Sequence, residues 1–260
     1  MILSMTKVIT FIIFLFGSVC TYSEFEFNQK VEVLARSFPI GGFSKFSMEA
    51  ITPIWGKKNH PKDISYGFLG GQLDYRTSAL VNYLSGKLFL YPIPILGLFF
   101  GQESGIKQLK KIDTFDCNKQ LCDGKMERSF MGLRLALAYQ NFFFVTENKW
   151  SNINPDKDSL PFVDEMTSLL GNPGQDKSFI SLNTLGYNLS EEKKFGAIYI
   201  SNEMKLRSAR SQMFNLFFQQ SWDRHTLISS IGVFQTRETQ DVGTLLFLYR
   251  WSTPSSFRLF

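Results

Sequence analysis

Apolar and polar residues alternate at every step along many short segments of this chain. In the segment 132–139, Leu133, Leu135 and Leu137 alternate with small or polar residues, and the segment 198–207 repeats the pattern around Ile198 and Ile200. Successive side chains of a strand point to opposite faces of its sheet. A period of two therefore predicts strands with one apolar and one polar face.

The alternation and the turn residues divide the chain into twelve predicted strands. They lie at 28–36, 43–53, 64–76, 80–91, 95–102, 127–139, 140–147, 178–188, 195–207, 211–221, 225–235 and 242–251. The longest apolar stretch, 87–100, contains Pro92 and Pro94, which interrupt helices, so it is divided between two strands and a turn. The longest connections, 103–126 and 148–177, are the fifth and the seventh, and both lie outside the cell if the termini are periplasmic. The second connection, at 56–63, is long for a periplasmic turn, which leaves ten strands as an alternative.

The N-terminus resembles a cleavable export signal. Lys7 precedes an apolar run at 8–16, which is too short to span a bilayer as a helix, and small residues follow it. We expect a signal peptide at 1–20, with cleavage after Cys20 or as late as Ser23, and export through the Sec pathway. Lipidation of Cys20 is the alternative.

An exported chain of such strands predicts an all-β fold. We expect residues 24–260 to form one closed antiparallel transmembrane β-barrel, with lipid outside and a polar interior. The 27 Phe, 9 Tyr and 4 Trp residues are typical of the aromatic girdles of such barrels.

The whole pattern resembles that of bacterial outer-membrane β-barrel proteins. The resemblance includes the signal, the alternating strands, the long outer loops and the terminal Phe260. It implies a location in the Gram-negative outer membrane, contact with outer-membrane lipid and insertion by the barrel-assembly machinery. The C-terminus departs from the usual insertion signal, because Pro254 interrupts the strand and Arg258 occupies a position that is usually apolar.

Charged residues of both signs occupy the polar faces of the predicted strands. We expect them to form a lumen charge network of Lys30, Glu32, Lys45, Glu49, Asp74, Arg76, Arg134, Glu203, Lys205, Arg207 and Arg250. Opposite charges in a narrow lumen should pair or stay hydrated. The network predicts either a structural barrel filled by side chains or a narrow porin-like pore for small polar solutes.

The cysteines and histidines give little sign of other chemistry. Cys117 and Cys122 lie in a polar, turn-rich stretch, and in an oxidising periplasm they predict a disulfide. The histidines, His60 and His225, are remote from these cysteines in sequence, so we expect no metal and no cofactor. The net charge of +5 is not clustered, and nucleic acid is not indicated as a partner.

Two enzymatic alternatives rest on short motifs. Asp223-Arg224-His225 resembles the Asp-x-His pair of omptin proteases, but no acidic pair occurs on an earlier strand and the topology places the motif in a periplasmic turn. Outer-membrane phospholipases and lipid A deacylases use a His-x-Ser pair, whereas Ser229 follows His225 by four positions, about 13 Å along a strand. We therefore expect a non-enzymatic protein, with a lipid-modifying enzyme or a protease as minor alternatives.

Two further expectations concern the outer loop and the class of protein. In the loop 148–177, the apolar residues of 160–170 have roughly helical spacing, which indicates a short helix that caps or enters the barrel mouth, with an ordered outer loop as the alternative. The alternative to a membrane barrel is a soluble periplasmic or secreted β-barrel that binds a ligand in its interior. The two differ in whether the apolar faces of the strands point outward to lipid or inward.

Overall fold

The computed structural model describes residues 25–56, 65–78, 80–108, 116–165, 167–236 and 241–254. The predicted signal peptide, the lipidation of Cys20 and the C-terminal residues Arg258 and Phe260 lie outside these ranges, and so does His60. These expectations stay predictions.

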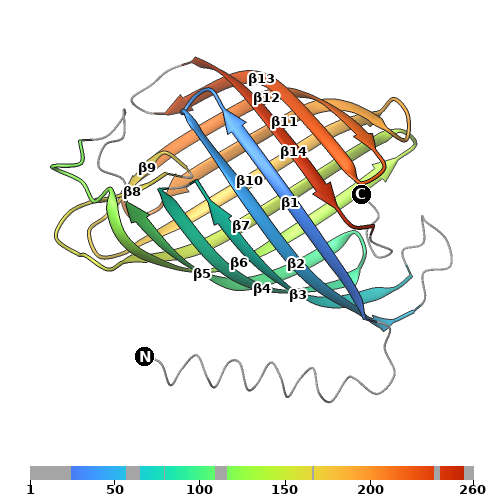
Figure 1. Cartoon of the computed structure of the whole chain (residues 1–260), viewed down its shortest axis with the longest axis horizontal. Coiled ribbons are helices and arrows are strands. Elements are labelled where there is room, and N and C mark those ends of the chain that lie inside the picture. Colours follow the sequence, from blue (N-terminus) through green and yellow to red (C-terminus); the bar gives the residue numbers. More distant parts are fainter. Residues whose placement is uncertain are drawn as a thin grey trace.

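Twelve antiparallel strands close into a barrel (Figure 1). The strands are β1 (Glu26–Arg36), β2 (Gly41–Trp55), β3 (Gly67–Thr77), β4 (Val81–Ile93), β5 (Leu96–Gln108), β6 (Asp123–Tyr139), β7 (Phe142–Pro155), β10 (Asp176–Asn188), β11 (Lys193–Met204), β12 (Ala209–Trp222), β13 (His225–Thr236) and β14 (Val242–Ser252). Each pairs with its neighbour in the chain, and β1 pairs with β14 to close the sheet. The predicted strand count is confirmed, and ten strands are excluded.

The strands extend further into the outer connections than the alternation predicts. β5 continues to Gln108, β6 begins at Asp123 and β7 continues to Pro155. The fifth and seventh connections are therefore 109–122 and 156–175, shorter than the predicted loops at 103–126 and 148–177. The extra strand residues pair in regular register with their neighbours although their composition is polar.

The outward face of the barrel is apolar. Leu73, Leu84, Met131 and Ile231 are at least 60% exposed and lie on the face opposite the lumen. A band of exposed apolar side chains around a closed sheet is what lipid requires of a membrane barrel. The protein is therefore an outer-membrane barrel and not a soluble barrel with its apolar face inward. Among the described residues, no helix is long and apolar enough to cross a membrane.

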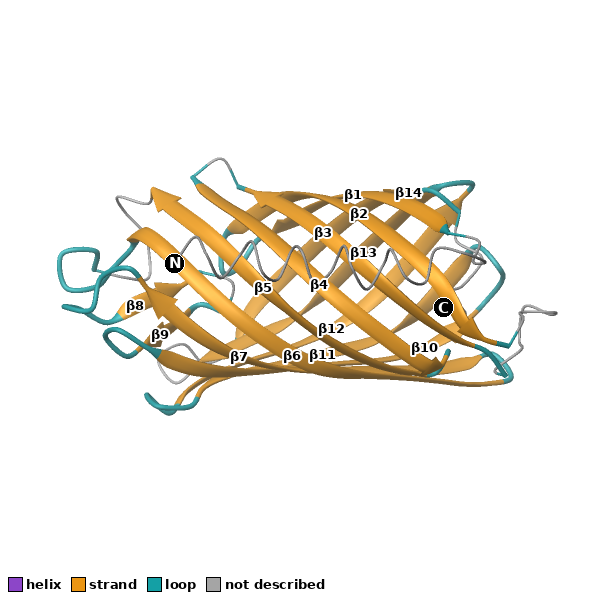
Figure 2. Ribbon diagram, turned by 90° about the horizontal axis from the view of Figure 1, so that it is seen from below, coloured by secondary structure: helices purple, strands orange, loops and turns teal. Residues whose placement is uncertain are grey.

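A two-stranded hairpin lies within the seventh connection. It consists of β8 (Phe162–Asp164) and β9 (Leu169–Gly171), near the barrel end opposite the strand termini Glu26 and Ser252 (Figure 2). The prediction of a helix at 160–170 is wrong. Every residue of β8 is buried, because the hairpin is enclosed on both faces, and without an exposed face its apolar residues do not alternate.

Several inward-facing glycines lie opposite an aromatic ring on the neighbouring strand. A Cβ atom on Gly132 would lie 2.2 Å from the Phe99 ring, and one on Gly70 would lie 2.2 Å from the Phe89 ring. The same arrangement holds for Gly101 with Phe130, Gly105 with Tyr83, Gly186 with Phe143 and Gly196 with Phe217. Each ring occupies the place of the missing side chain, so the aromatic residues lie against the wall.

Candidate functional site: the barrel lumen

The two sides of the lumen differ in chemistry. Direct cross-strand partners share a face, so the register identifies the inward residues of each strand. The inward faces of β1 to β7, which we call the charged wall, carry Lys30, Glu32, Lys45, Glu49, Asp74, Arg76, Lys87, Glu103, Lys107, Arg128, Arg134, Glu147 and Lys149. The inward faces of β10 to β13, which we call the apolar wall, combine uncharged polar residues such as Asn202, Asn215 and Ser230 with the apolar residues Ile180, Leu182, Ile198, Ile200, Met213, Phe217, Ile228 and Phe234. Charges on the apolar wall lie near strand ends, at Asp176 and Lys194.

A row of alternating charges crosses the seam where the barrel closes. Arg250 Nε on β14 donates to Glu32 Oε1 on β1 at 2.7 Å. Lys45 on β2 lies 3.7 Å from Glu32 and 3.5 Å from Asp74 on β3. This row joins four strands, and its cations keep contact with solvent, since the Arg250 and Lys45 side chains are 35% and 24% exposed.

Arg128 is the centre of a second cluster at the outer mouth. Its guanidinium donates to Glu103 Oε1 at 3.1 Å and to Asp164 Oδ1 of β8 at 3.1 Å. Arg76 lies 3.4 Å from the other oxygen of Glu103. The Arg128 and Asp164 side chains are only 3% and 1% exposed. Removing one partner of such a buried pair would leave an uncompensated charge.

The hairpin is held from both sides of the lumen. Lys107 Nζ on β5 lies 2.8 Å from Glu165 and also donates to the carbonyl of Val163, while Tyr83 Oη donates to Glu165 at 2.6 Å. On the opposite side, Ser211 Oγ on β12 donates to the Thr167 carbonyl at 2.9 Å. The hairpin therefore reaches across the outer mouth from the charged wall to the apolar wall.

The predicted disulfide joins Cys117 and Cys122, and its loop pairs with the hairpin. Leu121 donates its N–H to the Pro161 carbonyl at 2.8 Å and accepts from the N–H of Val163 at 3.1 Å. Leu121 and Phe162 share one cluster of buried apolar residues. The fifth and seventh connections thus form one outer cap.

Lys87 and Lys149 lie deeper in the lumen, beside aromatic rings. Lys87 Nζ is 5.6 Å from the centroid of Phe99, and Lys149 Nζ is 4.9 Å from that of Phe130. Within the described part of the chain, neither ammonium group has a carboxylate within 4 Å. Both side chains are half-buried, so solvent inside the barrel reaches them.

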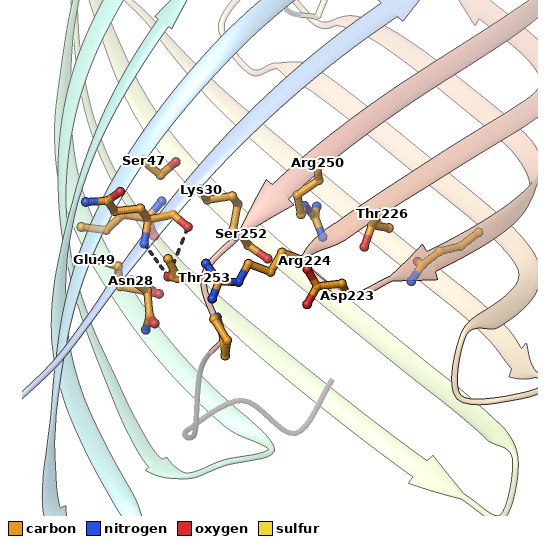
Figure 3. Close-up of a pocket in the computed structure, with 14 residues that line it drawn as sticks. Asn28, Lys30, Ser47, Glu49, Asp223, Arg224, Thr226, Arg250, Ser252 and Thr253 are labelled. Atoms are coloured by element: carbon orange, nitrogen blue, oxygen red, sulfur yellow. Dashed lines mark hydrogen bonds between the residues drawn. The ribbon is translucent and has the colours of Figure 1, made fainter.

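A pocket of about 340 Å³ opens at the end of the barrel where the strand termini lie (Figure 3). Its wall combines the charges of Lys30, Glu49, Asp223, Arg224 and Arg250 with hydroxyl and amide groups. Thr253 Oγ1 accepts from the N–H of Gln29 at 2.9 Å and closes one side. This is the periplasmic end, because the connections on that side include the short turns of the barrel.

The structure separates the residues of the predicted network. Glu32, Lys45, Asp74 and Arg250 form the row at the seam, Arg76 joins the outer cluster, and Lys30 and Glu49 line the periplasmic pocket. Arg134 faces inward from the middle of β6, directly across from Glu147. The network as one functional unit stays a prediction.

Three predicted lumen residues lie elsewhere. Glu203 shares its face of β11 with Phe195, which is exposed on the outside, while the opposite face carries the fully buried Met204. Lys205 and Arg207 lie in the turn after β11, and Lys205 pairs with Glu203 at 2.6 Å. The expectation is wrong because β11 turns its apolar face toward the lumen.

The predicted network also lacks several charged residues of the lumen. Lys107 lay inside a predicted loop. Arg128 has the same parity as Arg134 in β6, so an extension of that alternation would have found it. Asp164 and Glu165 become lumen residues only because the loop folds inward, and no local pattern indicates this.

The residues of the enzymatic alternatives lie at or near the periplasmic end. His225 Nδ1 is 2.7 Å from Tyr249 Oη, and its ring stacks on Trp222. Asp223 lines the pocket. Ser229 lies on the outward face of β13, the same face as His225, and its cross-strand partner is Phe247. In the described ranges, no group of three or more His, Cys, Asp or Glu side chains could hold a metal ion.

No protein-family profile and no curated protein sequence match the chain. Solved structures resemble it in fold at low identity. An outer membrane channel from Pseudomonas putida F1 is 8% identical, with a TM-score of 0.46, over 90% of this chain and 98% of that one. The KdgM porin, solved in complex with disordered oligogalacturonate, is 8% identical, with a TM-score of 0.44, over 87% and 99%. The translocator domain of the autotransporter NalP from Neisseria meningitidis is 7% identical, with a TM-score of 0.39, over 96% of each chain.

Proposed function

We propose that this outer-membrane barrel is a non-enzymatic narrow pore for small polar solutes, and that the β8–β9 hairpin restricts its outer mouth. The observation that carries the proposal is the change in hydration along the lumen. Toward the periplasmic end the lumen is open to solvent, because Arg250, two residues from the end of β14, is 35% exposed and lines the pocket there. The charged side chains that hold the hairpin are sealed, with Lys107 at 5% and Arg128 at 3% exposure.

A structural barrel filled by side chains would have no need of this gradient. Ion pairs that only brace the wall could be buried along its whole length. A solute path that is closed at one end, in contrast, requires hydrated charged side chains along the path and water-excluded charged side chains at the closed end. The polar pocket of about 340 Å³ at the periplasmic end supports the same interpretation.

The test is single-channel conductance of the full chain in planar bilayers, compared with a variant in which residues 158–174 are replaced by a short Gly-Ser linker. We expect a small or intermittent conductance for the parent and a severalfold larger, steady one for the variant. The double variant Glu203→Gln, Lys205→Gln is the matched control, because it removes an exposed ion pair on the outward side of the barrel.

Folding is checked independently by the change in gel mobility on boiling in SDS. A variant that folds but conducts no more than the parent would contradict the role of the hairpin. An absence of conductance in both folded proteins would favour the purely structural barrel.

A further inference from the structure

Lys87 and Lys149 differ from four of the buried or half-buried cations of the charged wall. Lys45, Arg76, Lys107 and Arg128 each have a carboxylate within 4 Å. For Lys87 and Lys149, the described residues supply aromatic rings instead. Lys87 lies beside Phe89 and Phe99, and Lys149 beside Phe130. A ring face holds an ammonium group in place without neutralising its charge.

The carboxylates of this region do not balance these cations. Asp74 lies beside Lys45, and Glu103 beside Arg76 and Arg128. Glu147 faces inward one step along β7 from Lys149, opposite Arg134, and Glu49 faces inward on β2, in the same cross-strand row as Lys87. The three cations Lys87, Lys149 and Arg134 therefore face two carboxylates, Glu147 and Glu49. The middle of the charged wall carries a surplus of one positive charge.

Aromatic packing brings the two lysines to one site. The rings of Phe99 and Phe130 are 6.3 Å apart and lie in contact with each other. Each lies over a glycine of the adjacent strand, Gly132 and Gly101 respectively. The two ring planes are tilted by 60° to each other, and each ring has an ammonium group near it, Lys87 at Phe99 and Lys149 at Phe130.

The apolar wall begins directly beside this site. Lys149 is the cross-strand partner of Ile180, and Glu147 is that of Leu182. Ile200 follows Leu182 on the next strand, and all three apolar residues are half-buried on the inward face. A solute that contacts both walls meets ammonium groups on one side and aliphatic side chains on the other.

We propose that the middle of the lumen binds small amphipathic organic anions. Their carboxylate or sulfonate group is held by Lys87 and Lys149, and their apolar body lies against Leu182 and Ile200. This inference rests on the proposed pore, since the solute reaches the site through the lumen. It narrows the solute class from small polar molecules to anions with one apolar part.

The experiment measures binding apart from transport. The full chain is placed in lipid nanodiscs, and saturation-transfer NMR titrations compare hexanoate with hexan-1-ol, which lacks the charge, and with acetate, which lacks the apolar chain. We expect saturable binding of hexanoate that is about tenfold tighter than that of either control, since one charged hydrogen bond or a few buried methylenes contribute about that much.

Variants identify the site. Lys87→Gln and Lys149→Gln should each weaken hexanoate binding about tenfold, and Ile200→Thr should weaken hexanoate but not acetate. Lys193→Gln, an exposed outward position at the start of β11, is the matched control and should bind as the parent does. Each glutamine removes a charge from the lumen, so folding, checked by gel mobility, is expected to persist.

Three results would overturn the inference: equal binding of hexanoate and hexan-1-ol, binding unchanged in the two lysine variants, or no saturable hexanoate binding. If conductance is present and specific binding absent, the pore stands and the solute class is wrong. If specific binding is present and conductance absent even without the hairpin, the site stands and the pore is wrong.

Discussion

The charged wall and the apolar wall belong to one sheet, yet they hold the same hairpin by different means. Toward the charged wall, Asp164 and Glu165 make ion pairs with Arg128 and Lys107. Toward the apolar wall, the contacts are the hydrogen bond from Ser211 and the packing of Met204, whereas the same apolar cluster also includes Val81, Met126 and Ile153 of the charged wall. The difference indicates that ion pairs hold the hairpin only at the charged wall, while apolar packing contributes on both sides. Substitutions on the two walls can test this.

The largest effect is expected from Arg128→Met on the charged wall. It leaves Glu103 without one partner and Asp164 buried without its cation, which should lower the free energy of unfolding by about 3–5 kcal/mol. Urea unfolding followed by tryptophan fluorescence measures this. Arg210→Met, at an exposed position near the outer end of β12, should change stability little, and an equal loss in both variants would contradict the role of the cluster.

Glycine substitutions on the two walls compare how tightly their aromatic rings pack against the neighbouring strand. Gly132→Ala places a Cβ atom where the Phe99 ring lies, and Gly186→Ala on β10, in the apolar wall, does the same with the Phe143 ring. Both should cost about 1–3 kcal/mol by overpacking. Gly243→Ala, where the new Cβ has no atom within 4 Å, is the control. If only Gly132→Ala is destabilising, the two walls differ in packing as well as in charge.

Tyr83→Phe tests a single bond of the hairpin. It removes the hydroxyl that donates to Glu165 but leaves the ion pair with Lys107, so the expected loss is about 1 kcal/mol. The effect should appear as faster amide hydrogen exchange in 162–171 with little change in the barrel strands. Ser211→Ala is the counterpart on the apolar wall. Comparable exchange in both variants would show that the walls contribute equally.

The smallest effect is expected at the outer pair of Glu203 and Lys205. The two side chains are 37% and 46% exposed, so Glu203→Gln should change stability by about 0.5 kcal/mol or less. Urea unfolding at low and high salt measures it. A loss similar to that of Arg128→Met would mean that this pair is coupled to the lumen after all.

Much of the barrel could be predicted from the sequence because a period of two is a local property. The strand order could also be predicted, because consecutive antiparallel strands joined by turns pair with each other. Glu32 and Lys45 fall on one face by parity alone, and their register makes them neighbours. The disulfide between Cys117 and Cys122 was predictable from proximity and compartment.

The errors arise because a local sequence pattern does not determine how a strand face or a loop is placed in the folded barrel. Alternation shows that a strand has two faces but not which one points inward, and in β11 the apolar Ile198 and Ile200 point to the lumen. Glu203 was therefore assigned to the wrong side. The position of Asp164 beside Arg128 depends on a loop folding back over 36 residues of sequence, which no local pattern encodes.

The pairing of glycines with aromatic rings also limits how this sequence can change over time. Replacing a glycine alone forces its ring into the lumen, and replacing a ring alone leaves an empty groove beside a bare backbone. The two positions are therefore energetically coupled, and a tolerated exchange must alter both, as a non-additive double-mutant cycle would reveal. Substitutions at the two coupled positions should therefore be correlated among descendants of this barrel, even where the charged residues of its lumen are replaced.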